Sequence, residues 1–127
     1  MSAEFSIDAD SSNDLIRIRM AGFFTEADIL AFLAARREAH AKLRCGMNQH
    51  VTLNDLRDMK IQSQEMVDAF RAVLADPLYR SRRLAFVVGP TLARTQLMRA
   101  VAGRNVRCFD DIWTAEAWLR LDDAQAA

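Results

Sequence analysis

Residue types that often carry special chemistry are scarce in this sequence. Its 127 residues include two cysteines, two prolines and four glycines. Cys45 and Cys108 are too few for the disulfide framework of a small secreted protein, so we expect a reduced, cytoplasmic chain. Basic and acidic residues number 17 each, which gives a formal net charge of zero. Attraction to an anionic partner would therefore need a local patch of positive charge.

Long apolar segments are absent too. No run approaches the ~20 residues that a helix needs to span a bilayer, so we expect no transmembrane segment. The opening residues Met1–Glu4 show neither the basic nor the apolar region of a secretory signal. A content of 51% hydrophobic and 27% charged residues is that of an ordinary globular protein. The length suits one domain over residues 1–127, with a core over about 4–121.

Most catalytic motifs are missing from the chain. The segment Gly89–Thr95 has neither the lysine of a phosphate-binding loop nor the glycine spacing of a dinucleotide site. No Gly-x-Ser-x-Gly sequence places a serine for acyl transfer. Cys45 and His50 are close in sequence, but a tetrahedral zinc site needs four ligands in recognisable pairs. We expect no metal, no cofactor and no enzymatic activity.

The hydrophobic pattern alternates between strands and helices. An opening hairpin is predicted by the alternation in Glu4–Ile7 and Leu15–Met20, with Ala9–Asp14 as its loop. The remaining predicted elements are a helix from Thr25 to about Leu43, a strand Val51–Asn54, a helix from Ser63 to Asp76, a strand Leu84–Val88, a helix reaching Gly103, a strand Asn105–Phe109 and a helix Ile112–Leu121. This order predicts an α/β fold with a mostly parallel five-stranded sheet, four helices and one antiparallel hairpin.

The first predicted helix carries two basic residues within its apolar face. Ile29, Phe32 and Leu33 define that face at ~3.6 residues per turn. Arg36 and His40 fall on the same face, where an unpaired buried charge would be costly. Two interpretations follow. Arg36 extends along its aliphatic stem to water, or the pair forms a polar spot in an apolar pocket that binds the acidic head group of a ligand.

Arginine is concentrated in the second half of the chain. Between Asp76 and Asp110 there is no acidic residue, whereas seven arginines occur, at positions 80, 82, 83, 94, 99, 104 and 107. The turn after the fourth predicted strand opens a helix, with Thr91 as its cap and Arg94 one turn later. Free backbone N–H groups at such a helix start can bind an anion. We therefore consider Thr91 and Arg94 as candidate anion-binding residues, with a plain strand-to-helix turn as the alternative.

Apolar residues exceed what one core needs. Phe23 and Phe24 precede the first predicted helix, Leu30 lies off its core face, and Trp113 lies outside the main stripe of the last helix. A helix that is apolar on two faces is buried or contacts a partner. We expect these four residues to form a partner or membrane surface; a homodimer or a hydrophobic ligand would each explain them.

The chain resembles the SpoIIAA-like proteins, a STAS-type group that is also likened to the CRAL-TRIO lipid-binding fold. The residues that carry this resemblance cover nearly the whole domain: Gly22–Asp28, Asn54–Arg57, Arg83–Gly89, Phe109–Asp111 and Ala117–Leu119. The resemblance implies a cytoplasmic, non-enzymatic domain that works by binding. In the anti-sigma antagonists of the group, a serine at the start of the second helix is phosphorylated. Here Ser63 lacks the preceding aspartate and the following glycine, so we expect a helix cap instead of a phosphorylation site.

Two functions are therefore open at the level of sequence. The first is a STAS-type regulatory domain that binds a protein partner or itself. The alternative is a small lipid or hydrophobic-acid binding protein with peripheral membrane contact, in which Arg36 or His40 meets the ligand's head group. Nucleic-acid binding is disfavoured, because the sequence pI is only 6.7 and the arginines are not interleaved with stacking aromatic residues.

Overall fold

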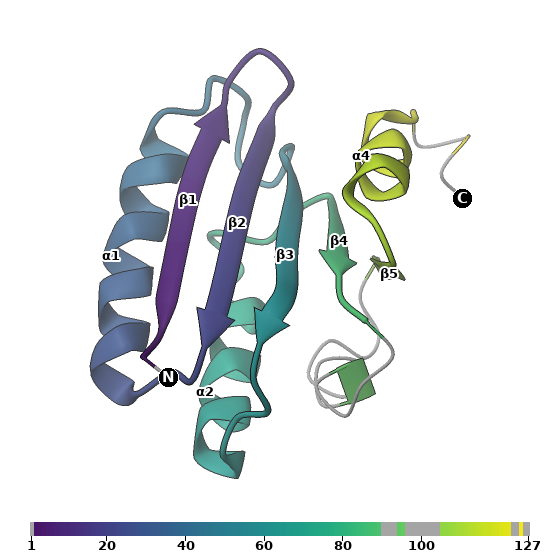
Figure 1. The fold of residues 1–127 in the computed structure, drawn as a ribbon. Helices are drawn as coiled ribbons and strands as arrows, with labels where there is room; N and C mark the ends of the chain where they lie inside the picture. Colours follow the sequence, from purple (N-terminus) through teal and green to yellow (C-terminus); the bar gives the residue numbers. More distant parts are fainter. Residues whose placement is uncertain (1, 90–93, 96–104, 123–124, 126–127) are drawn as a thin grey trace.

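Five strands form one sheet in the order β1-β2-β3-β4-β5 in this computed structural model, which describes residues 2–89, 94–95, 105–122 and 125 (Figure 1). The strands are β1 (Glu4–Asp10), β2 (Leu15–Gly22), β3 (Val51–Met59), β4 (Arg83–Val87) and β5 (Val106–Phe109). Strand β1 is antiparallel to β2 along its whole length, and the other three pairings are parallel. The sheet is therefore mixed, and our expectation of a mostly parallel sheet is corrected: the hairpin contributes a full-length edge strand.

Helices cover both faces of the sheet. Figure 1 shows α1 (Glu26–Ala41) and α2 (Gln64–Ala75) on one face and α4 (Ile112–Arg120) on the other. Three helices are described where the sequence predicted four. The remaining predicted helix, which was expected to reach Gly103, falls mainly on residues 90–93 and 96–104, outside the described residues. Within the described part of the chain, no helix is long and apolar enough to cross a membrane.

The three helices begin where their sequences provide capping side chains. Thr25 and Asp28 form a reciprocal capping box at the start of α1. Ser63 Oγ accepts a hydrogen bond from the Met66 N–H, and Asp111 accepts one from the Thr114 N–H. Ser63 is thus confirmed as the N-cap of α2. Its hydroxyl satisfies a backbone donor that the helix itself leaves free.

Strand β3 is central and longer than predicted. It continues past Asn54 to Met59, because pairing with the last residues of β2 overrides the low strand propensity of its polar second half; its pairing with β4 ends at Asp55. Its side chains alternate between two apolar layers. Leu53 packs in the layer beneath α4, whereas Leu56 packs in the layer beneath α1 and α2. Asn54 has the same parity as Leu56, so it faces the helices α1 and α2.

Candidate ligand-binding site

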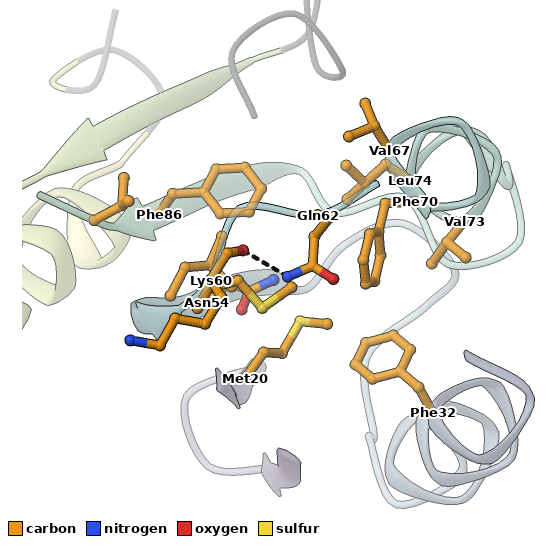
Figure 2. Close-up of a pocket in the computed structure, with 13 residues that line it drawn as sticks. Met20, Phe32, Asn54, Lys60, Gln62, Val67, Phe70, Val73, Leu74 and Phe86 are labelled. Carbon is orange, nitrogen blue, oxygen red and sulfur yellow. Dashed lines mark hydrogen bonds between the residues drawn. The ribbon is translucent and has the colours of Figure 1, made fainter. Parts of the chain in front are cut away.

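A pocket lies between the sheet and helix α2. Its volume is about 80 Å³, and most of its wall is apolar. Figure 2 shows that side chains from the strands of the sheet, from helix α1 and from helix α2 converge on the pocket. The main apolar lining residues are Met20, Phe32, Leu56, Phe70, Leu74 and Phe86.

Helix α2 supplies one wall of this pocket through its apolar stripe. This stripe consists of Val67, Phe70, Val73 and Leu74, and all four line the pocket. Val67 is buried, while the other three remain half-buried. The stripe therefore borders a space that protein atoms do not fill, and a ligand entering it would cover more of this surface.

Gln62 closes the pocket at the carboxyl end of the parallel strands. Its Oε1 accepts a hydrogen bond from the Phe24 N–H at 2.9 Å, and its Nε2 donates to the Gly22 carbonyl at 3.0 Å. Nε2 also donates to the Lys60 carbonyl, the contact drawn as a dashed line in Figure 2. The buried amide thus joins the β2–α1 connection to the β3–α2 connection. Lys60 itself lines the pocket and is exposed, which places an ammonium group at the mouth.

Asn54 is the unusual polar residue of the pocket. It lies in the middle of β3, beside Phe86 of β4, and only 6% of its surface is exposed. Its Oδ1 is buried and has no hydrogen-bond partner among the residues that the structure describes. A buried acceptor without a partner costs roughly 1–3 kcal/mol. Such an atom in the wall of a pocket is a binding group that is available to a ligand.

Arg36 does not line this pocket. It is 7% exposed, and its Nη1 donates to the Val73 carbonyl at 2.9 Å. Its Nη2 lies 3.4 Å from Asp76 Oδ2, and the guanidinium stacks over the Tyr79 ring at 4.1 Å. The interpretation that Arg36 extends to water is wrong. The guanidinium instead holds the end of α2 against α1, and its charge is used within the fold.

His40 belongs to the same cluster as Arg36. Its Nδ1 donates to the Arg36 carbonyl at 2.9 Å, and its Nε2 lies 3.2 Å from Nε2 of His50. His50 is 2% exposed, and burial together with the neighbouring His40 lowers the pKa of His50 to about 4. The structure shows a contact between the half-buried imidazole of His40 and the buried imidazole of His50, which joins α1 to the segment before β3.

The candidate anion site is only partly described. Thr91 lies outside the described residues, whereas Arg94 Nη1 lies 3.7 Å from Asp110 Oδ1. The described arginines of the second half do not share one face. Arg83 is 1% exposed and donates to the carbonyls of Trp118 and Leu121 at the end of α4. Arginines 99 and 104 lie outside the described residues.

The four predicted surface residues divide into three exposed and one buried. Phe23 is 48% exposed, Leu30 64% and Trp113 84%. Phe24 is only 5% exposed, so its placement at the surface is corrected. The chain turns inward after β2, and the Phe24 ring packs edge-on against Phe70, with ring centroids 5.4 Å apart.

Sequence reasoning missed the polar residues of the pocket. Asn54, Lys60 and Gln62 come from one strand and the connection after it, and no motif joins them. One signal was available. Thr52 and Asn54 alternate with Val51 and Leu53 in an apolar strand, which places two polar side chains on a face that should be covered. A polar residue at a covered position marks a hydrogen bond or a cavity.

Comparison with known proteins defines the fold class. No protein-family model matches the chain, and no curated protein matches it. Among solved structures, it is similar to an uncharacterised DUF3478 family protein from Shewanella loihica PV-4, described as having a SpoIIAA-like fold. The TM-score is 0.72, with 17% sequence identity over 94% of this chain and 96% of the other. The chain thus has a SpoIIAA-like α/β fold, as its sequence predicted.

Proposed function

We propose that this protein is a non-enzymatic binding protein for a small, largely apolar molecule. The observation that carries the proposal is the apolar pocket with an unpartnered amide oxygen of Asn54 in its wall. Ligand sites are typically concave and apolar, with a few polar groups that orient the ligand. The polar lining residues that the structure describes are an asparagine, a glutamine and a lysine, and Gln62 is already hydrogen-bonded. This set suits binding rather than acid–base or nucleophilic chemistry.

Binding of an apolar probe to pocket variants tests the proposal. Val67→Phe adds a ring at the pocket wall, and we expect it to weaken binding of a small apolar probe such as 1-hexanol, followed through the amide chemical shifts of the pocket residues, at least tenfold. Leu30→Ser is the matched control, because Leu30 is exposed on α1 away from the pocket lining. Mass spectrometry of the protein isolated from cells should reveal a co-purified small molecule that is released on denaturation. Equal probe binding by both variants, with no co-purified molecule, would overturn the proposal.

The exposed residues near the pocket mouth favour delivery of the ligand from a membrane surface. Phe23 and Ile61 are 48% and 47% exposed. They lie on the two connections that Gln62 joins, next to the exposed Lys60. An apolar pair beside an ammonium group suits the interface of an anionic bilayer. Flotation with liposomes should show binding that falls when Phe23 and Ile61 are both changed to serine; unaltered flotation would remove the membrane step.

A second candidate function is protein binding through α4. Trp113 is 84% exposed, and large aromatic residues are enriched at the centres of protein interfaces. This observation supports the STAS-type expectation of a protein partner or a homodimer. Sedimentation of the wild type and of Trp113→Ser at several concentrations tests self-association. A monomer at every concentration for both proteins would exclude the homodimer.

A further inference from the structure

We infer that the pocket selects a ligand with a neutral hydroxyl group, which hydrogen-bonds to the amide of Asn54. This inference rests on the proposed function, since it names the ligand class of the same pocket. It differs from the acidic ligand that the sequence suggested. The difference has two reasons. The polar group that the pocket wall offers to a ligand is the amide of Asn54, and the Arg36 guanidinium is bound to other residues of the fold.

A pure hydrocarbon would leave the polar wall of the pocket unsatisfied. Oδ1 of Asn54 has no partner within the described part of the chain, and an apolar ligand would exclude water from it without replacing the hydrogen bond. A ligand that donates a hydrogen to this atom gains a contact that the protein alone does not make. The free acceptor therefore favours a polar group at one end of the ligand.

A carboxylate fits this position poorly. It has no hydrogen to donate to Oδ1, and an ion in an apolar cavity needs a nearby opposite charge. The cationic residue in the described lining is Lys60. It is exposed and lies beyond the end of β3, six residues after Asn54. Arg36 is held by Val73 and Asp76. No cation of the described lining therefore lies beside the amide.

A hydroxyl group matches the amide because it carries the hydrogen that Oδ1 lacks. The volume of about 80 Å³ is about half of the ~150 Å³ cavity that takes benzene, so roughly three or four carbons fit beside the hydroxyl. A longer chain would extend toward Lys60. Met20 and Met59 in the wall can adjust to different shapes.

Four probes of similar length test this selectivity: 1-hexanol, its isomer 1-methoxypentane, hexanoate and hexane. Amide chemical shifts of the pocket residues give the dissociation constant of each probe. We expect 1-hexanol to bind about tenfold more tightly than the ether, which donates no hydrogen bond. Hexanoate should bind more weakly than 1-hexanol. In Asn54→Leu the advantage of the alcohol over the ether should disappear, whereas in Val67→Phe all probes should weaken together.

The outcomes separate the inference from the proposed function. Equal binding of alcohol and ether by the wild type would overturn the hydroxyl inference while the pocket remains a binding site. Tighter binding of hexanoate would also overturn it and would favour an acidic ligand. Failure of all four probes to shift any pocket residue would overturn both. The comparison of alcohol and ether needs only the wild type, so it holds even if Asn54→Leu folds poorly.

Discussion

At the scale of single residues, Gly22 shows how a backbone position is fixed by its surroundings. Its φ is +79°, and a Cβ placed there would collide with the carbonyl oxygen of Ser2. Gly22 also accepts the hydrogen bond of Gln62 at the edge of the pocket. The backbone of Gly22 must keep this conformation for the connection between β2 and α1 to meet Gln62. Glycine alone tolerates both the positive φ and the close approach of the Ser2 carbonyl.

Gly22→Ala should therefore destabilise the fold by about 2–3 kcal/mol, because it combines a strained φ with a steric collision against backbone. Urea unfolding followed by circular dichroism measures the loss. Gly46→Ala is the matched control, since the nearest atom to its added Cβ is Cγ of Gln49 at 3.7 Å. A change of similar size in both variants would contradict this account of Gly22.

The buried imidazole of His50 gives the stability a pH dependence. His50 faces His40 from α1, Asp14 from the hairpin turn, and Tyr79 and Ser81 from the segment before β4. Its pKa is about 4 in the folded protein, against 6.5 for a free imidazole. Between these values the unfolded chain takes up a proton that the folded protein does not, so stability falls as the pH falls.

We expect the free energy of unfolding to stay at its highest value above pH 6.5. It should decrease by up to about 3 kcal/mol as the pH approaches 4. Urea titrations at several pH values measure this slope. His50→Asn should flatten it. The carboxyl groups of Asp10, Asp55 and Asp111 have lowered pKa values, so their contribution is lost only below their usual range and does not account for this window. A slope unchanged in His50→Asn would contradict the assignment.

At the scale of elements, Arg83 connects strand β4 to helix α4. Its guanidinium donates to two carbonyls at the end of the helix, those of Trp118 and Leu121. The Trp118 carbonyl also accepts from the Leu121 N–H, so Arg83 adds a second donor there. Positive charge is also favourable at a helix carboxyl end. The sequence suggested that Arg83 belonged to a basic surface. Its burial could not be predicted, because the helix that it caps begins almost thirty residues later.

Arg83→Met should cost about 2–4 kcal/mol of stability, since the Leu121 carbonyl loses the guanidinium donor and the Trp118 carbonyl keeps only the Leu121 N–H. Arg107→Met is the control. Arg107 is exposed and stacks on the Trp118 ring at 5.1 Å, a contact worth about 0.5–1 kcal/mol. Thermal unfolding monitored through tryptophan fluorescence measures both, because Trp118 lies on the buried face of α4. Equal losses in the two variants would show that Arg83 does not hold the helix end.

At the scale of the whole molecule, sequence reasoning predicted the layers and missed the pocket. Periodicity predicted every described strand and helix in order, because each element carries its own apolar pattern. Helix caps at Thr25 and Ser63 were also local signals. The pocket is different: Asn54, Phe70 and Phe86 meet in it only after three separate elements have packed together. The empty space depends on how side chains of several elements fit, and no single segment encodes it.

The same pocket predicts an opposition between stability and binding. Asn54 leaves an acceptor unsatisfied, so Asn54→Leu, which keeps the branched shape, should stabilise the ligand-free protein by about 1 kcal/mol, or roughly 4 °C in Tm. Thr52→Val is the matched control on the same face of β3, because the Thr52 hydroxyl is hydrogen-bonded to Ser81. That variant should destabilise the fold by a similar amount. Calorimetry without ligand measures both. A loss of stability in Asn54→Leu would mean that the amide serves folding; a gain would mean that the fold tolerates Asn54 at a cost, as expected of a residue kept for binding.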